Sequence, residues 1–141
     1  MEKKVDSNCI FCKIIAGEIP SRTVYEDEGY KAIMDVSPAS KGHVIVLPKN
    51  HASNVFEISE EELSGAMIVA KKVAAMLKEK LGCDGVNILQ NNGEDAGQTV
   101  FHLHVHVIPR FKNDQLGLTW KQGEADAKVL DEIIDQAKKM F

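Results

Sequence analysis

The stretch FHLHVHVIPR, residues 101–110, holds three of the chain's five histidines at every second position. Alternation is the period of a β-strand, whose successive side chains point to opposite faces of the sheet. We therefore expect His102, His104 and His106 on one face, with roughly 7 Å between neighbours. The opposite face is expected to carry apolar core residues: Phe101, Leu103, Val105 and Val107. Pro109 has no N–H to donate and is expected to end the strand.

Three imidazoles in register indicate chemistry, because three protonated rings side by side would repel one another. Neutral rings offer donors, acceptors, metal-binding nitrogens and a nucleophile that titrates near physiological pH. A single catalytic metal ion bound by all three rings is incompatible with the spacing of these residues on a flat strand. Ligand nitrogens must meet about 2 Å from one ion, and these residues are spaced on the order of 7 Å apart. Whether the trio binds a structural metal or acts on a substrate stays open on this evidence.

Length and composition indicate one globular domain. The chain has 141 residues, of which 44% are hydrophobic and 27% charged, and its net charge is −4. We expect a single domain over residues 1–141 with a polar N-terminal tail at 1–8. Neither a basic surface for nucleic acid nor an apolar membrane segment is evident. We therefore expect a cytoplasmic protein that binds neither nucleic acid nor a membrane. Disulfides are rare in that compartment, and Cys83 is expected to be a small buried hydrophobe.

The remaining pattern predicts an α+β fold in which strands and helices are segregated. A short helix is expected within CIFCKIIAGEIP (9–20), and segment 111–124 is expected to be irregular. Further strands are expected in three segments: TVYEDEGYKAIMD (23–35), HVIVLP (43–48) and GVNIL (85–89).

Two longer helices are expected, the clearer one over residues 59–82. Ser59 and Glu62 have the spacing of a capping box, and Gly82 suits the C-terminal cap. Its apolar stripe is predicted to comprise Leu63, Met67, Ala70, Ala74, Leu77 and Leu81. The second helix, roughly Asp126 to Lys139, is predicted to bury Val129, Leu130, Ile133, Ile134 and Ala137.

Cys9 and Cys12 have the spacing of a zinc knuckle or of a redox dithiol. A redox motif is expected at the end of a strand in a βαβ unit, whereas this one nearly opens the chain. Two unrelated buried cysteines are the other alternative. Zinc needs two more ligands, and His102 could supply one; the spacing alone does not select His51 over His43 for the other. Four protein ligands would close the coordination shell and make such a zinc structural.

These motifs together resemble the histidine triad (HIT) superfamily, whose signature alternates three histidines with hydrophobic residues. It stands here as His102-Leu-His104-Val-His106-Val-Ile. The segments CIFCKIIAGEIPS, YEDE, DVSPASKGHVIVLPKNH and NNGEDAGQTVFHLHVHVIPR resemble the bacterial Hint-type branch, over about residues 8–120. The resemblance implies a β-meander or half-barrel of about five antiparallel strands with one long packed helix, and a C-terminal helix is expected as well. It also implies a homodimer with a sheet continuous across both chains.

The chemistry implied by the resemblance is nucleotidyl transfer to water from a nucleoside monophosphate derivative, such as a phosphoramidate or related adenylate. His104 would be the nucleophile that forms a covalent nucleotidyl-histidine. His106 would donate to a phosphate oxygen or to the leaving atom. His43 would support the triad as a fourth histidine. A nucleotide-binding regulatory module with incidental hydrolysis is the alternative that remains open.

The resemblance also assigns a purine nucleotide site, with adenine or guanine and the leaving group unspecified. The base pocket would be lined by Phe11, Ile14 and Val36, and Asp35 would hold the ribose hydroxyls. The phosphate would be bound by Asn91, Gly97, Gln98 and Thr99.

The assignment of His43 to the triad frees His51 for a metal site. The resemblance thus implies one structural Zn²⁺ per chain, held by Cys9, Cys12, His51 and His102. Many Hint proteins lack these cysteines and use the first triad histidine in a hydrogen-bonded relay. Here His102 becomes a candidate ligand instead.

Overall fold

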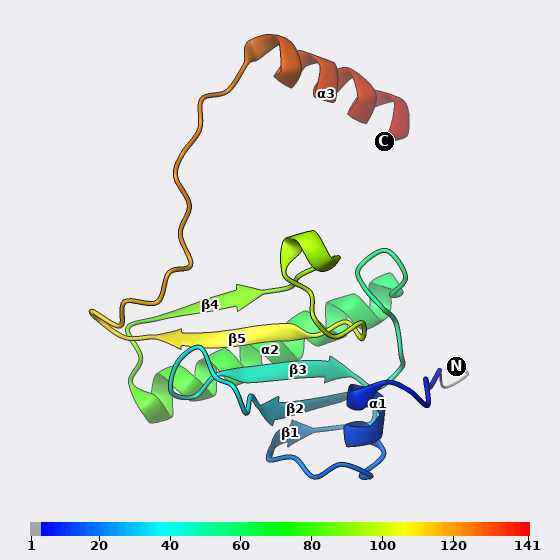
Figure 1. Ribbon diagram of the computed structural model, residues 1–141, viewed down its shortest axis with the longest axis vertical. Coiled ribbons are helices and arrows are strands. Elements are labelled where there is room, and N and C mark those ends of the chain that lie inside the picture. Colours follow the sequence, from blue (N-terminus) through cyan, green and yellow to red (C-terminus); the bar gives the residue numbers. More distant parts are fainter. Residues whose placement is uncertain (1–3) are drawn as a thin grey trace.

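The computed structural model describes residues 4–141, so the first three residues of the predicted tail lie outside the described range. The sheet is open and antiparallel, with strand order β1-β2-β3-β5-β4, and α2 packs behind it (Figure 1). The elements in chain order are α1 (Ile10–Ile15), β1 (Thr23–Glu26), β2 (Tyr30–Met34), β3 (Val44–Pro48), α2 (Glu60–Leu81), β4 (Gly85–Leu89), the 3₁₀ helix η1 (Glu94–Ala96), β5 (Val105–Arg110) and α3 (Ala127–Met140). This arrangement confirms the predicted α+β class.

The sheet has two differently covered faces because side chains alternate along each strand. One face packs on α2 through a fully apolar layer that includes Ala32, Val46 and Val105. The other face presents Ile33 and Ile45, directly paired across β2 and β3, to the short helix α1. The sheet therefore separates a closed hydrophobic core from a more open side, where the histidines lie.

The position of β5 determines the layout of the open side. Strands β1, β2 and β3 are neighbours in sequence, whereas β5 is inserted between β3 and β4. Its register pairs His106 with Ile45 of β3 and with Leu89 of β4. A histidine is thereby held in the middle of the sheet beside the apolar row formed by Ile33 and Ile45.

Helix α2 begins and ends as the sequence predicts. The Ser59 hydroxyl accepts a hydrogen bond from the Glu62 backbone N–H at 3.1 Å and donates to the Glu62 carboxylate at 3.0 Å. Gly82 ends the helix in the left-handed region, with φ of 64°. The buried face is rotated from the predicted stripe and comprises Ala66, Val69, Ala70, Val73 and Leu77. Met67, predicted to be core, is 44% exposed.

The histidine segment corrects two predictions. Strand β5 begins only at Val105, so Phe101 precedes the regular ladder and is 50% exposed instead of belonging to the core. Pro109 lies within β5 instead of ending it, and its carbonyl accepts a hydrogen bond from the Ser40 hydroxyl at 2.6 Å. Proline is compatible with a strand where its nitrogen is not needed as a ladder donor.

The C-terminal helix forms where it was predicted, but its apolar side is not buried against the body of the chain. Its predicted core positions Val129, Leu130, Ile133 and Ile134 are 47–56% exposed, and Ala137 is only partly buried. The prediction of burial is wrong for this single chain, because the extended segment before α3 carries the helix away from the sheet (Figure 1). Within residues 4–141, no helix has the length and apolar character needed to span a membrane.

Replacing Gly65 of α2 with alanine is expected to destabilise the protein. A Cβ at this position would meet the ring and hydroxyl of Tyr30, which donates to the Glu62 carbonyl at 3.0 Å. Overpacking costs roughly 1–3 kcal/mol and opposes the gain of about 1 kcal/mol in helix propensity. Urea denaturation measures the change, with exposed Ser64→Ala as the control, expected within about 0.5 kcal/mol of wild type. A Gly65→Ala protein as stable as wild type would show that Tyr30 does not constrain this position.

Candidate functional site

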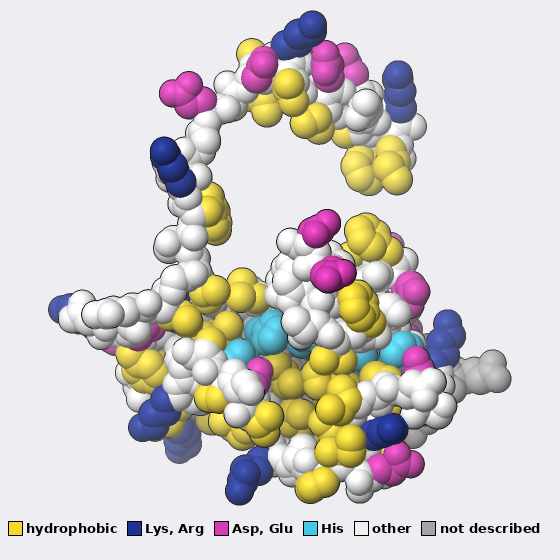
Figure 2. All heavy atoms as spheres, in the orientation of Figure 1, with side chains coloured by type: hydrophobic (Ala, Val, Ile, Leu, Met, Phe, Trp, Pro, Cys, Tyr) yellow, Lys and Arg dark blue, Asp and Glu magenta, His cyan; other side chains and the backbone are white. Residues whose placement is uncertain are grey.

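A cavity of about 440 Å³ lies on the open side of the sheet, between α1 and the histidine segment. This volume is within the range of about 300–1,000 Å³ that is usual for small-molecule sites. The cavity is lined by seven of the predicted site residues: Phe11, Ile14, Asp35, Val36, Thr99, His104 and His106. Figure 2 shows histidine side chains among hydrophobic ones on this face. The fold thus gathers residues from α1, from the end of β2 and from β5.

The cavity wall is apolar, and its reactive end carries the histidines. Phe11 and Ile14 are both buried, and the Phe11 ring stands edge-on to His104 with 5.1 Å between centroids. Ile33 and Ile45 form the floor beside His106. Val36 lies at the rim and is 91% exposed. The arrangement suits a flat apolar group at one end and a polar, reactive group at the other.

His104 is held in one tautomer by the backbone. Its Nδ1 lies 2.8 Å from the carbonyl oxygen of His102, and a carbonyl can only accept, so Nδ1 carries the proton. The ring is 7% exposed, and burial lowers the pKa of His104 below its ordinary value. At neutral pH His104 is therefore an uncharged imidazole whose Nε2 has a free lone pair.

His106 is oriented by a directional chain of two hydrogen bonds. The Ala39 backbone N–H donates to His43 Nδ1 at 2.9 Å, which places the proton of the neutral His43 ring on Nε2. His43 Nε2 lies 2.9 Å from His106 Nδ1 and donates to it. His106 consequently carries its own proton on Nε2. The Ala39 backbone amide, acting through His43, thus makes His106 Nε2 a hydrogen-bond donor.

The rings of this relay are neutral at physiological pH. Burial, together with the neighbouring His104 and His43 rings, lowers the pKa of His106 to about 4. Burial also lowers the pKa of His43, against the opposing effect of the Asp35 carboxylate. Neutral rings remove the mutual repulsion that three imidazolium groups would suffer.

Asp35 links the relay to the cavity rim. Its Oδ1 accepts from the Ser37 backbone N–H at 2.7 Å, and its Oδ2 lies 3.6 Å from His43 Nε2. Asp35, His43 and His106 place ligand-type atoms within 4.8 Å of one another. The hydrogen-bond direction disfavours a metal there, because His43 Nε2 carries a proton and His43 Nδ1 already accepts one. The cluster is better explained as a hydrogen-bonded chain that orients His106.

The loop before β5 divides the predicted phosphate-binding residues. Thr99 lines the cavity, whereas Asn91, Gly97 and Gln98 do not. The Gln98 amide is buried: it accepts from Gly93 N–H at 2.8 Å and donates to the Ser53 carbonyl at 2.6 Å. Gly97 has φ of 95° and ends η1 in a conformation that favours glycine. In this structure Gln98 therefore shapes the loop instead of pointing into the cavity.

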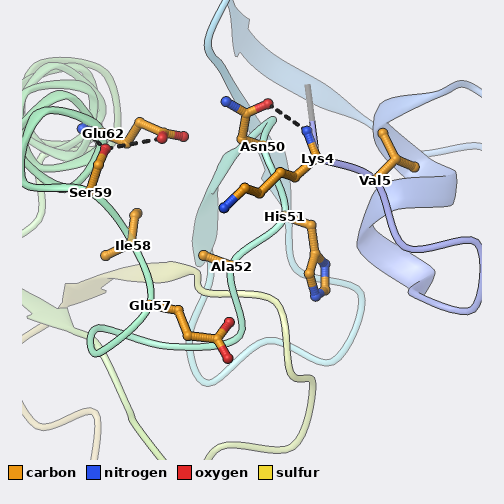
Figure 3. Close-up of a pocket in the computed structure, with 9 residues that line it drawn as sticks. All are labelled: Lys4, Val5, Asn50, His51, Ala52, Glu57, Ile58, Ser59 and Glu62. Atoms are coloured by element: carbon orange, nitrogen blue, oxygen red, sulfur yellow. Dashed lines mark hydrogen bonds between the residues drawn. The ribbon is translucent and has the colours of Figure 1, made fainter. Parts of the chain in front are cut away.

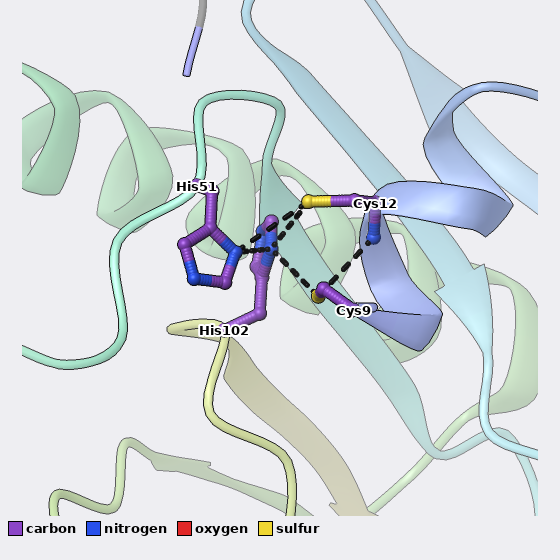
Figure 4. A group of neighbouring side chains, drawn as sticks. All are labelled: Cys9, Cys12, His51 and His102. Carbon is purple, nitrogen blue, oxygen red and sulfur yellow. Dashed lines mark hydrogen bonds between the residues drawn. The ribbon is translucent and has the colours of Figure 1, made fainter. Parts of the chain in front are cut away.

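A second cluster brings together Cys9, Cys12, His51 and His102 (Figure 4). The two imidazole Nδ1 atoms lie 3.2 Å apart. The Cys12 sulfur lies 3.5 Å from His51 Nδ1 and 3.6 Å from His102 Nδ1. The Cys9 sulfur lies 3.5 Å from His102 Nδ1. The four donor atoms come from α1 and its N-cap residue Cys9, from the loop after β3 and from the segment before β5.

These distances fit a tetrahedral zinc ion. With Zn–N of about 2.0–2.1 Å and Zn–S of about 2.3 Å, tetrahedral edges measure about 3.3 Å between nitrogens and about 3.6 Å between sulfur and nitrogen. His102 Nε2 lies 2.7 Å from the Pro48 carbonyl and must donate to it, so its Nδ1 is free to bind a metal. Zinc at this site would have no open coordination position and would supply cross-linking of the three segments.

A cavity of about 480 Å³ lies beside the metal cluster and away from the triad (Figure 3). Its polar groups serve the fold: Ser59 and Glu62 cap α2, and the Glu57 carboxylate accepts from the Ser53 backbone N–H at 2.8 Å. The Lys4 backbone N–H donates to the Asn50 side chain at 3.2 Å, which fastens the N-terminal segment there. We therefore place the chemistry in the cavity that contains His104.

Sequence reasoning did not identify several residues of the candidate site. Ile33 and Ile45 could have been found from strand alternation, because both follow the period of their predicted strands. Nothing in the sequence indicated Ala39, since only its backbone N–H takes part, as the donor to His43 Nδ1. The further cavity-lining residues absent from the predictions are Ile10, Ile19, Pro20, Ser21, Met34, Ser37 and Val100.

Comparisons with known proteins agree with this geometry. A family model described as the HIT domain matches residues 16–113. The crystal structure of a HIT family protein from Bacillus subtilis is 43% identical, with a TM-score of 0.88, and the match covers 96% of this chain and 98% of that one. The adenosine 5'-monophosphoramidase HNT1 of Saccharomyces cerevisiae is 39% identical over 131 residues, 92% of this chain and 80% of the relative. A Zn-bound histidine triad family protein from Mycobacterium smegmatis is 34% identical, with a TM-score of 0.76 and coverage of 95% and 98%.

Removing one cysteine of the cluster is expected to abolish zinc binding and to lower stability. Cys12→Ser would leave the other three donors without a complete shell, so purified protein should contain far less than one zinc per chain. The free energy of unfolding should fall by more than about 3 kcal/mol relative to the zinc-loaded protein. Elemental analysis and denaturant unfolding measure both quantities.

Cys83→Ser is the matched control, because Cys83 is also buried but does not belong to the cluster. It should retain its metal. A Cys12→Ser protein that still carries one zinc per chain would contradict the assigned ligand set.

Proposed function

The chain belongs to the HIT domain family, and on this premise we propose that it is a nucleotide hydrolase that acts at the α-phosphorus of nucleoside monophosphate derivatives. Nucleoside phosphoramidates are the proposed substrate class. One observation carries the proposal: the backbone leaves His104 Nε2 unprotonated, while the relay gives His106 a proton on Nε2. A nucleophile and a hydrogen-bond donor therefore lie side by side, with 4.8 Å between ring centroids.

In the first step of the proposed reaction, the lone pair of His104 Nε2 attacks the α-phosphorus. A P–N bond forms to the enzyme as the bond between phosphorus and the leaving nitrogen breaks. The departing nitrogen keeps the proton of the N-protonated phosphoramidate and leaves as a neutral amine and not as a high-energy amide anion, while His106 Nε2–H donates a hydrogen bond to a phosphate oxygen. As positive charge develops on His104, its Nδ1–H is already held by the His102 carbonyl.

In the second step, water attacks the phosphorus of the nucleotidyl-histidine. The attacking water releases a proton to the solvent, and the P–N bond to His104 breaks and returns the electron pair to Nε2. The nucleoside monophosphate leaves, with both rings in their starting tautomers. Covalent catalysis thus divides one displacement into two easier steps.

The proposed substrate orientation follows the polarity of the cavity. The base would lie against Phe11 and Ile14, the ribose hydroxyls would approach Asp35, and the phosphate would face Thr99 and His104. The name of the yeast relative, an adenosine 5'-monophosphoramidase, supports adenine as the preferred base and an amine as the leaving group.

The proposal includes a structural zinc ion, a homodimer and a cytoplasmic location. The donor geometry and the Zn-bound mycobacterial relative support zinc. The edge strand β4 is only partly covered and could extend the sheet into a second copy, as the family resemblance implies. All three cysteines are free, which fits a reducing compartment.

His104→Ala is expected to lower kcat/KM for adenosine 5'-phosphoramidate by at least about 10⁴-fold, because the nucleophile is removed. AMP should still bind, since the apolar wall is retained; isothermal calorimetry measures this. Wild-type protein quenched with a slow substrate should carry an adenylyl group on the peptide that contains His104. Phe101→Ala, half-exposed and outside the cavity lining, is the control and should retain turnover.

Two outcomes would count against the proposal. Turnover that survives His104→Ala would rule out this nucleophile. A wild-type rate far below the enzyme median of about 10 s⁻¹ with every phosphoramidate tested would favour the alternative of a nucleotide-binding module with incidental hydrolysis.

The acid limb of the pH profile of kcat/KM is expected below the ordinary histidine value of 6.5. His104 must be unprotonated to attack, and burial lowers its pKa; His106 must be neutral for its Nδ1 to accept from His43, and its pKa is lowered to about 4. Activity should therefore be maintained from pH 7 down through pH 6.5 and fall only at lower pH. Circular dichroism at each pH separates this titration from acid unfolding. A limb at or above pH 6.5 in folded protein would contradict these lowered pKa values.

A further inference from the structure

The segment before α1, residues 4–8, lies against the metal cluster and is called the N-terminal strap below. At its start, the Lys4 carbonyl accepts a hydrogen bond from the His51 backbone N–H at 2.8 Å. Near its end, the Asp6 carbonyl accepts from the backbone N–H of Cys9, the N-cap of α1, at 3.1 Å. The strap is therefore fastened both to the loop that carries one candidate metal ligand and to the helix that follows another.

A histidine that binds a metal through one ring nitrogen usually donates the N–H of the other to a carboxylate, a backbone carbonyl or water. This partner fixes the tautomer and the orientation of the ring. His102 has such a partner, because its Nε2 lies 2.7 Å from the Pro48 carbonyl. His51 directs Nδ1 at the cluster, and its Nε2 points away from the other three ligands (Figure 4). His51 Nε2 is thus the ring nitrogen whose partner remains to be assigned.

The Asp6 carboxylate lies beside this nitrogen. Its Oδ2 is 3.9 Å from His51 Nε2, and within residues 4–141 no other side chain forms a hydrogen bond or ion pair with that atom. At this distance the contact is electrostatic and not a direct hydrogen bond. Zinc on Nδ1 would leave the ring proton on Nε2 and draw positive charge onto the ring. A carboxylate at this position would stabilise that charge.

The two oxygens of Asp6 have different partners. Oδ1 accepts from the Asn8 backbone N–H at 2.9 Å, which is the hydrogen bond of an Asx-turn. This turn orients the carboxylate, so that Oδ2 is the oxygen that faces His51. The His51 side chain is 17% exposed and that of Asp6 is 48% exposed, so water shields the contact only in part. One oxygen therefore shapes the strap, and the other approaches the metal cluster.

The negative charge of Asp6 is compatible with a zinc-loaded cluster. Two thiolates, from Cys9 and Cys12, would balance the two positive charges of the ion, and both histidines would bind as neutral rings. The loaded centre would have no net charge and would not repel the carboxylate. The remaining interaction is the attraction between Asp6 and the polarised ring of His51.

We propose that the Asp6 carboxylate is the partner of His51 Nε2 and holds this ring in the orientation that binds zinc. The inference rests on the structural zinc ion of the proposed function and adds a positioning residue that is not itself a ligand. Asp6 acts through His51, so its loss weakens zinc binding while all four ligands stay in place.

Replacing Asp6 with asparagine separates the roles of its two oxygens. The amide oxygen can still accept from Asn8, whereas the amide NH₂ has no charge and cannot accept from His51 Nε2. Competition between the full chain and the zinc chelator 4-(2-pyridylazo)resorcinol measures the zinc dissociation constant. It should rise about tenfold in Asp6→Asn, at the lower end of the roughly 10–100-fold effect of losing such a partner, because Asp6 is half exposed.

Asp6→Glu tests the opposite combination. Glutamate keeps the negative charge near His51, but its longer side chain does not form the Asx-turn with Asn8. Asp6→Glu should therefore bind zinc more tightly than Asp6→Asn. Glu57→Gln is the matched charge control, because Glu57 lines the cavity beside His51 but accepts from the Ser53 backbone N–H at 2.8 Å. This variant should retain wild-type zinc affinity.

Three results would overturn the proposal. Wild-type zinc affinity in Asp6→Asn would mean that water serves His51 Nε2. Weaker binding by Asp6→Glu than by Asp6→Asn would mean that the turn matters and the charge does not. A loss in Glu57→Gln equal to that in Asp6→Asn would reveal a general effect of negative charge around the cluster.

These results can be told apart from failure of the proposed function. A protein that binds zinc and hydrolyses phosphoramidates, with unchanged zinc affinity in Asp6→Asn, would refute the role of Asp6 alone. A wild-type protein that binds no zinc would refute the structural zinc ion together with the role of Asp6, whereas the test of His104 would stand. Weakened zinc binding in Asp6→Asn, in a protein without turnover, would refute the hydrolase alone.

Discussion

The burial of His102 is the constraint on which the rest of the site depends, because both ring nitrogens and the carbonyl of this residue have partners in the site. Its ring Nε2 donates to the Pro48 carbonyl, and its Nδ1 faces the thiol groups of Cys9 and Cys12. Its own carbonyl accepts from His104 Nδ1. The residue is completely buried, so none of these partners can be exchanged for water without cost. A displacement of His102 would disturb the metal cluster and the tautomer of His104 together.

Backbone groups, and not charges, set the tautomers of the histidines in the site. The Ala39 amide orders His43, which orders His106, and the His102 carbonyl orders His104. Burial keeps the neighbouring imidazoles neutral, and these hydrogen bonds make them distinct: Nε2 of His104 has a lone pair, and Nε2 of His106 has a proton. Because the groups are fixed before a ligand arrives, little reorganisation is required during a reaction.

Local patterns in the sequence predicted most of the fold, and the failures have physical causes. The capping box at Ser59 and the strand periods were confirmed because they depend on neighbouring residues. Phe101 was misplaced because alternation does not reveal where a ladder begins. The burial of Ile133 was wrong for one chain, since an amphipathic pattern does not say which surface covers it.

In the candidate site too, features that depend on residue type could be predicted, whereas features that depend on contacts between distant residues could not. The histidines and Cys9 could be selected by residue type, which limits the chemistry available to each. The role of Gln98 in the loop could not be predicted from its residue type, because it depends on contacts with Gly93 and with Ser53, which is 45 residues away. The relay that begins at Ala39 was equally inaccessible, since any residue with a backbone N–H could provide it.

Helix α1 is six residues long, yet it contributes to two sites at once. Cys12 points to the metal cluster, whereas Phe11 and Ile14 form the cavity wall. Exchanging one side chain of the wall for another leaves the cysteine spacing intact, but inserting or deleting a single residue would turn the helix by about 100° and misplace both. The shape of the cavity wall can therefore change through point substitutions, whereas a change in the length of α1 would disrupt both sites.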